Sequence, residues 1–123
     1  MISRIEKVTV YVESQESAKR FWLEKIGFIV ALERPMGPGM TWLEVGPKGE
    51  GLTILVLYPK QAMLQQNPGM VAHPSVIFLS PDVEAFHARI TAAGVDADPV
   101  QTLPVGRMFS FRDQDGNRYM VRG

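Results

Sequence analysis

The side chains best suited to chemistry in this chain lie in two short runs with strand-like spacing. Thr9 and Tyr11 follow Lys7 at two-residue intervals, and Trp42 and Glu44 are spaced in the same way. Residues two apart share one face of a strand, so each run would present its polar and aromatic groups together. An ammonium, a carboxylate and aromatic rings on one surface have the make-up of a site for a small organic ligand.

Lys7 and Glu44 support two readings. They could form an ordinary ion pair on a solvated sheet face, where such a pair adds little stability, and Trp42 could fill space in a dimer interface. The sharper hypothesis is that the Lys7 ammonium holds an anionic or carbonyl oxygen of a ligand, with Glu44 as its counter-charge.

The chain has two histidines. His87 follows Phe86 at the edge of a helical apolar stripe, where we expect a surface or half-buried structural role. His73 precedes Pro74 in a connecting segment and could reach the site if the strand register is shifted. His73 with Glu44 is therefore a possible, unconventional metal set.

Several classes of function find no support. The chain has no cysteine, which excludes disulfides, zinc-thiolate sites and thiol catalysis. It contains no dinucleotide-binding, phosphate-loop or serine-hydrolase motif. The run Asp113 to Asn117 fails as a calcium loop, because Arg118 stands where glycine is needed, so we expect a hairpin turn. Its 13 basic and 13 acidic residues balance, and no apolar stretch is long enough for a membrane span. We therefore expect a cytoplasmic protein that binds neither nucleic acid nor membrane.

The spacing of apolar residues predicts the elements that position these groups. Val8, Val10 and Val12 alternate with polar residues and predict a strand. Ser14 can cap a helix from Gln15 to Lys25. Strands over 28–33, 41–45 and 52–58 follow, with a loop at 34–40 that could act as a lid.

The pattern restarts after a connector at 59–74. A strand at 75–79 leads to a helix that Ser80 and Pro81 begin and Gly94 ends. Strands over 95–100, 107–112 and 118–122 follow. The sequence thus predicts a single α+β domain over 1–123, built from two βαβββ modules at about 5–58 and 75–122.

Four segments carry a family resemblance. They are the run Lys7 to Val12, the spacing from Phe21-Trp22 to Gly27-Phe28, the helix from Val83-Glu84-Ala85-Phe86 to Ala93-Gly94-Val95, and the closing Asp113-Gln114-Asp115-Gly116-Asn117. Together they resemble the glyoxalase / bleomycin-resistance / extradiol-dioxygenase family, also called the vicinal oxygen chelate superfamily. The resemblance implies paired modules whose mixed sheets curl into a cup, with helices on the convex face, and often a homodimer. It also implies a divalent metal held by four side chains, although other members hold antibiotics without a metal.

The positions of those four metal ligands fall here on unsuitable residues. The first falls on Lys7, the second on about Leu55, the third near Ser75 and the last on Met120. An ammonium has no lone pair, leucine has no donor atom, and a thioether is too soft for the metals these sites favour. We therefore expect no metal and no cofactor.

The resemblance and the alternation of side chains together predict the lining of the cup, while Leu43, Val45, Tyr119 and Val121 should face the core. The favoured function is metal-free binding of a small, partly aromatic or amphipathic molecule. One alternative is a glyoxalase-type lyase or isomerase, similar to lactoylglutathione lyase, that uses an unrecognised metal set. Another is a ligand-free dimeric structural or regulatory module. The predicted lining is Lys7, Thr9, Tyr11, Trp42, Glu44, Leu55, Ser75 and Met120.

Overall fold

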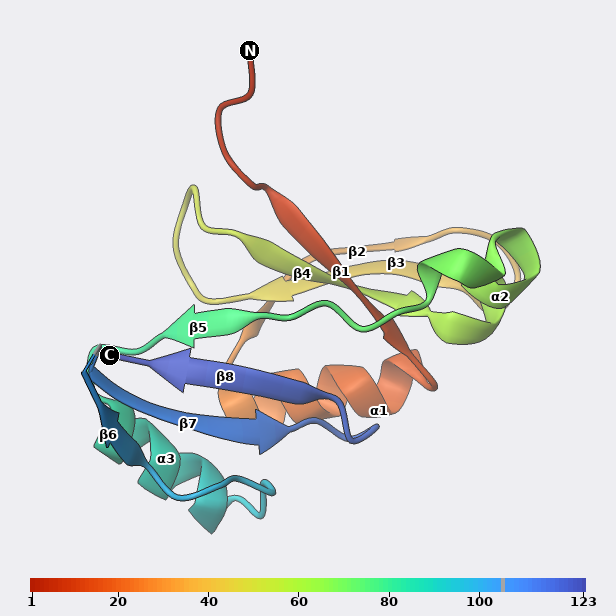
Figure 1. Cartoon of the computed structure of the whole chain (residues 1–123). Coiled ribbons are helices and arrows are strands. Elements are labelled where there is room, and N and C mark those ends of the chain that lie inside the picture. Colours follow the sequence, from red (N-terminus) through yellow and green to blue (C-terminus); the bar gives the residue numbers. More distant parts are fainter. Residues whose placement is uncertain (105) are drawn as a thin grey trace. The chain divides into compact units, whose positions relative to one another are not determined.

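The computed structural model describes residues 1–104 and 106–123. It divides into two compact units, Met1–Pro74 and Ser75–Gly123, and each contains one four-stranded mixed sheet (Figure 1). Each sheet arises from one β-α-β-β-β sequence of elements. The predicted α+β class and the repeated βαβββ module are confirmed. The second unit begins where module two was expected to begin; that the two modules form a single domain stays a prediction.

Module one forms a sheet in the order β1-β4-β3-β2, in which β1 runs parallel to β4 and the other pairs are antiparallel. Val10 and Val12 are fully buried, and α1 packs against the sheet. The burial of alternate residues in β1 therefore follows the predicted period of two. The elements are β1 (Lys7–Val12), α1 (Gln15–Arg20), η1 (Phe21–Ile26), β2 (Ile29–Pro35), β3 (Thr41–Gly46) and β4 (Ile54–Pro59).

The first helix differs from expectation in its second half. Ser14 caps it as predicted, since its hydroxyl accepts from the Ser17 N–H at 3.3 Å. The α-helix, however, ends at Arg20, and the chain continues as the π-helix η1 up to Gly27, whose φ is 90°. The wider turn buries the consecutive aromatic residues Phe21 and Trp22 together. The predicted helix from Gln15 to Lys25 and the left-handed Gly27 after it are thus confirmed, while the π-helical form of the second half was not predicted.

The connector is more regular than predicted. It contains α2 (Lys60–Gln66) and the 3-10 helix η2 (Pro68–Met70), where we expected only a connecting segment. The Gln66 side-chain amide donates to the Tyr58 hydroxyl at 2.9 Å, which ties the end of α2 to β4. The connector is thus attached to the face of module one on which Tyr58 lies.

Module two forms a sheet in the order β5-β8-β7-β6, with β5 parallel to β8. Its helix is capped by Asp82, whose carboxylate accepts from the Ala85 N–H at 3.0 Å. The predicted cap, Ser80, lies before the cap position, and aspartate is as good a cap as serine. The elements are β5 (Ile77–Leu79), α3 (Val83–Ala92), β6 (Gln101–Leu103), β7 (Gly106–Arg112) and β8 (Arg118–Arg122).

The prediction of a strand at 95–100 was wrong, because the regular strand lies later in the chain and this segment pairs only briefly. The Asp98 N–H donates to the Ser110 carbonyl at 2.8 Å, so this segment pairs with β7 for a short distance. Pro99 has no N–H to continue the pairing. The strand resumes only at Gln101, as β6. The break leaves Asp98 beside the sheet and close to the end of β7.

The turn between β7 and β8 is the hairpin turn that was predicted. Asp113 is 7% exposed, and its carboxylate accepts hydrogen bonds from the N–H groups of Asp115 and Asn117, from the Asn117 amide and from the Tyr119 hydroxyl. Burial, the negative charge of Asp113 and their hydrogen bond raise the pKa of Tyr119 far above its ordinary value of 10.0. The carboxylate thereby organises the turn from inside.

No helix in the described part of the chain has both the length and the apolar character that a membrane crossing requires.

Candidate functional site

Strand register decides which side chains of module one share a surface. Thr9 pairs with Val56, and Val56 pairs with Glu44, so these three residues form one row across β1, β4 and β3. Side chains in one row point to the same face, and residues two positions away along each strand join them. The structure therefore brings Lys7, Thr9, Tyr11, Trp42 and Glu44 onto one face, as the spacing predicted. We call this surface the Lys7 face.

Leu55 does not lie on the Lys7 face. It pairs with Val8 and with Val45, whose row belongs to the opposite face that packs under α1. Leu55 is 4% exposed and is a core residue. Its neighbour Val56 takes the predicted place, so the expected position was wrong by one residue. A valine side chain has no donor atom either and cannot act as a metal ligand.

An ion pair lies at the centre of the Lys7 face. The Lys7 Nζ is 2.6 Å from Glu44 Oε2, and the Trp42 indole N–H donates to the same oxygen at 2.7 Å. Glu44 is only 4% exposed, whereas a third of the Lys7 side chain remains exposed. Burial alone would raise the pKa of Glu44, but the hydrogen bonds from Lys7 and Trp42 outweigh it and hold the pKa below its ordinary range.

Lys7 remains a cation in this arrangement. Its hydrogen bond to Glu44 raises the pKa of the ammonium, and Glu6 lies 3.3 Å away as a second, exposed acidic neighbour. A lysine that acts as a nucleophile or base needs a lowered pKa. The geometry therefore suits Lys7 to holding an oxygen atom of a ligand and not to attacking it.

Aromatic rings continue the Lys7 face. Tyr58 meets Tyr11 edge-on at 6.1 Å and Trp42 edge-on at 6.3 Å between ring centroids. Tyr58 was missed in the sequence, although it stands two residues after Val56 and so belongs to the same face. The alternation of side chains along β4 could have indicated this position, but only the strand register shows which of the two faces of β4 it is on. The result is an aromatic surface next to the Lys7 ammonium.

Module two has a pocket of about 120 Å³ on the face of its sheet that carries Met120. Ser75 is exposed just before β5 and is not among the described residues that line this pocket. The sequence did not predict the pocket, because its rim depends on the break at Pro99. Among the lining residues are Asp98, Gln101, Met108, Ser110, Arg118 and Met120.

A wider hollow of about 510 Å³ lies at the start of α1, and Gly39 of the 34–40 loop lines it. Leu43, which also lines it, belongs to the α1 side of the sheet and not to the Lys7 face. Gln15 binds both the Thr41 and the Leu57 carbonyl there, at 2.6 and 2.8 Å. The role of this loop as a lid stays a prediction.

The residues present do not fit the metal that the family resemblance implies. In the described part of the chain, no three histidine, cysteine, aspartate or glutamate side chains come together. His73 and Glu44 thus gain no third ligand of these types among those residues. His87 has the expected half-buried structural role: its Nε2 lies 2.9 Å from the Asp98 carbonyl, and its ring meets Phe109 edge-on at 4.9 Å.

Comparisons with known proteins agree with this fold. A family model described as "Glyoxalase/Bleomycin resistance protein/Dioxygenase superfamily" matches residues 4–121. The "Uncharacterized protein YetH" of Bacillus subtilis (strain 168) is 42% identical over 124 residues, which cover 99% of each chain.

Solved structures are similar as well. "TnmS3, an antibiotic binding protein from Streptomyces sp. CB03234" is 34% identical with a TM-score of 0.82, and the match covers 98% of this chain and 95% of that chain. "A glyoxalase/bleomycin resistance protein" of the same organism is 33% identical with a TM-score of 0.79, over 98% of this chain and 100% of that chain. This protein is therefore a member of the glyoxalase/bleomycin resistance protein/dioxygenase superfamily.

Proposed function

We propose that this protein binds and sequesters a small, partly aromatic molecule and that the Lys7 face contacts it. The observation that carries the proposal is the combination of Lys7, held as a cation by Glu44, with the rings of Trp42, Tyr11 and Tyr58 on the same face. Flat rings can stack on or meet these aromatic groups edge-on, and an acidic or carbonyl oxygen can accept from the ammonium. Sequestration requires contact area and no reacting group.

The similarity to an antibiotic-binding protein supports the same class of ligand. That relative is 34% identical over nearly the whole chain. Fold alone does not assign a function. The side chains of the Lys7 face carry the proposal, and the relative adds support to it. The contacts predicted for Ser75 and Met120, the cytoplasmic location and the homodimer belong to this proposal as expectations.

Absence of metal chemistry is also part of the proposal. Lys7 occupies the first expected ligand position and Val56 the second, and neither can coordinate a cation. Elemental analysis of untreated protein tests this directly. Near-stoichiometric Mn, Fe, Ni or Zn that disappears in Glu44→Gln or His73→Ala would overturn it in favour of a glyoxalase-type enzyme.

A binding experiment with 1-anilinonaphthalene-8-sulfonate tests the site, because this probe combines aromatic rings with one negative charge. Lys7→Met should weaken binding about tenfold, since a hydrogen bond to a charged group is lost. Glu44→Gln should strengthen binding, because it removes the negative charge that neutralises Lys7. The opposite signs distinguish a cation that holds the ligand from a general loss of structure.

Lys19→Met is the matched control for this experiment. Lys19 also pairs with a glutamate, Glu33, at 2.9 Å, but it lies on α1 and not on the Lys7 face. Its substitution should leave affinity unchanged, and circular dichroism should show that all three variants are folded. Equal affinities for wild type and Lys7→Met, or no saturable binding to wild type, would contradict the proposal.

A further inference from the structure

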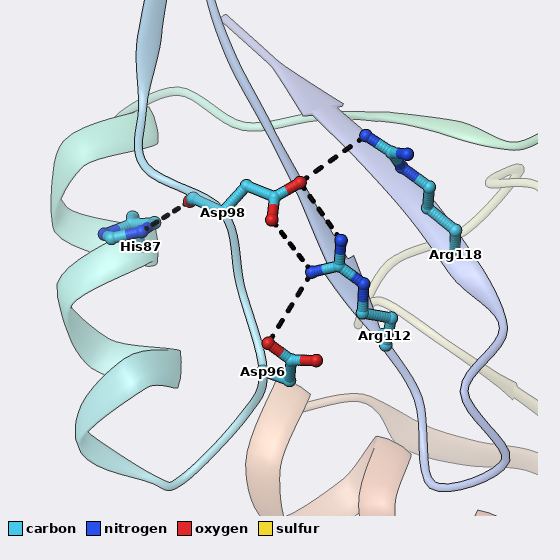
Figure 2. A network of polar contacts seen from close by, with 5 residues as sticks. All are labelled: His87, Asp96, Asp98, Arg112 and Arg118. Atoms are coloured by element: carbon cyan, nitrogen blue, oxygen red, sulfur yellow. Dashed lines mark hydrogen bonds and ion pairs between the residues drawn. The ribbon is translucent and has the colours of Figure 1, made fainter.

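Two arginines stand directly opposite each other in module two. Arg112 of β7 pairs in register with Arg118 of β8. Like charges at such positions repel, so the arrangement requires a compensating acid. Figure 2 shows that Asp98 supplies it: both guanidinium groups point at its carboxylate from neighbouring strands.

Asp98 holds the two arginines unequally. Arg112 makes two parallel contacts to it, at 3.0 and 3.2 Å, and also lies 3.6 Å from Asp96. Arg118 contacts the Asp98 carboxylate through one nitrogen, at 3.4 Å. Hydrogen bonds from Arg112 are the main cause that lowers the pKa of Asp98. A two-pronged pair is the stronger one, so Arg112 would keep Asp98 in place if Arg118 turned elsewhere.

Arg118 is also the more exposed of the two. Its side chain is 63% exposed, against 26% for Arg112, and it lines the 120 Å³ pocket whereas Arg112 is not among the described lining residues. A guanidinium has five N–H donors, so an acceptor in the pocket can bind to it without displacing Arg112 from Asp98.

The pocket lining contains a further polar side chain besides Arg118, that of Ser110. Ser110 is 5% exposed and lines the pocket beside its strand neighbours Met108 and Met120. At about 30 Å³ per water, the pocket holds about four waters, which is the room for a short acid group and not for a whole drug-sized molecule. Methionine side chains adapt to irregular apolar groups.

We propose that this pocket binds the carboxylate of a small aliphatic acid, with Arg118 as the cation that receives it, Ser110 as a hydrogen-bond donor and the two methionines around the alkyl part. A ligand ammonium is the less suitable occupant, because it would compete with Arg112 for the oxygens of Asp98. This inference goes beyond the proposed function, since it assigns a chemical group and two residues, Arg118 and Ser110, that the predicted lining does not include, although Met120 belongs to both.

The test is a titration of the full-length protein with butyrate and with its neutral isostere butyramide. Binding is measured by the NMR chemical shifts of the backbone amide groups. Butyrate should shift the signals of Met108, Ser110 and Met120 in a saturable way, and butyramide should bind about tenfold more weakly or not at all. Arg118→Gln should weaken the binding of butyrate about tenfold and leave the binding of butyramide unchanged. Raising the salt concentration should weaken the binding of butyrate but not that of butyramide.

Arg122→Gln is the matched control. Arg122 lies on the same strand and face, pairs with Met108, is exposed, and is outside the pocket lining that the structure describes. It should bind butyrate as wild type does. The proposal is overturned if acid and amide bind equally, if the two arginine variants behave alike, or if butyrate causes no saturable shifts in module two. The test with 1-anilinonaphthalene-8-sulfonate depends on Lys7 and Glu44, whereas the butyrate test depends on Arg118, so the two proposals can fail separately.

Discussion

Lys7 of β1 and Glu44 of β3 form their 2.6 Å ion pair across an intervening strand, β4. Neighbouring strands are about 4.8 Å apart, so the two backbones are separated by about twice that distance. The long side chain of Lys7 spans this distance across β4, the strand to which Val56 belongs. The pair therefore links three strands of module one on the face that we propose binds ligand.

Glu44→Gln should destabilise module one at neutral pH by about 1–2 kcal/mol, because two hydrogen bonds lose their charged acceptor while Lys7 stays partly in water. The pKa of Glu44 is below its ordinary value of 4.5, so its contribution is present above that pH and is lost as the pH falls through the lower, folded pKa. Urea denaturation should show the difference between wild type and variant shrinking in acid. A pH-independent difference would contradict this account.

Leu55→Ala should cost about 2–5 kcal/mol, because the residue is 4% exposed and packs on the α1 side of the sheet. It should not change affinity at the Lys7 face once the protein is folded. Thr9→Val is the comparison variant, because Thr9 lies on the Lys7 face. It should change the stability of the protein only slightly but should change the affinity for the probe. A specific loss of binding in Leu55→Ala at unchanged stability would restore Leu55 to the lining.

Asp113→Ala should destabilise module two by about 2–4 kcal/mol, since two turn N–H groups and the buried Tyr119 hydroxyl lose their acceptor. Asp113→Asn keeps one oxygen acceptor and should lose less. Asp115→Ala, in the same turn but only half-buried, should cost less than about 1 kcal/mol. Thermal unfolding compares the three; equal losses for Asp113→Ala and Asp115→Ala would exclude the organising role of Asp113.

Tyr119 should make the protein sensitive to alkali. Burial and Asp113 raise its pKa above the ordinary 10.0, so the neutral phenol stabilises the fold below that pH, and stability falls as the pH rises beyond it. Ionisation of this one group should lower the free energy of unfolding by about 1.4 kcal/mol for each pH unit above that value. Guanidinium denaturation between about pH 9 and 11 should show a shallower decline in Tyr119→Phe. Identical slopes would mean that Tyr119 ionises normally in the folded protein.

Some of the site was readable from residue types alone. The alternation around Val10 and Val12 placed Lys7, Thr9 and Tyr11 on one face, because successive side chains of a strand point to opposite sides whatever its neighbours are. The same rule placed Trp42 with Glu44, and Tyr119 with Val121 in the core. Capping by Ser14 and the turn at Asp113 depend on residues close in sequence, and both were predicted.

Other features depended on contacts between distant segments. Whether Leu55 or Val56 faces Lys7 is decided by the register of β4 against β1 and β3, and a shift of one residue reverses the face of every side chain. Asp98 lies between Arg112 and Arg118 because β7 and β8 are paired there and Pro99 ends the ladder beside them. Local sequence thus determined the strands and their two faces, whereas only the pairing of strands decided which faces meet, since hydrogen-bond partners far apart in the chain set that register.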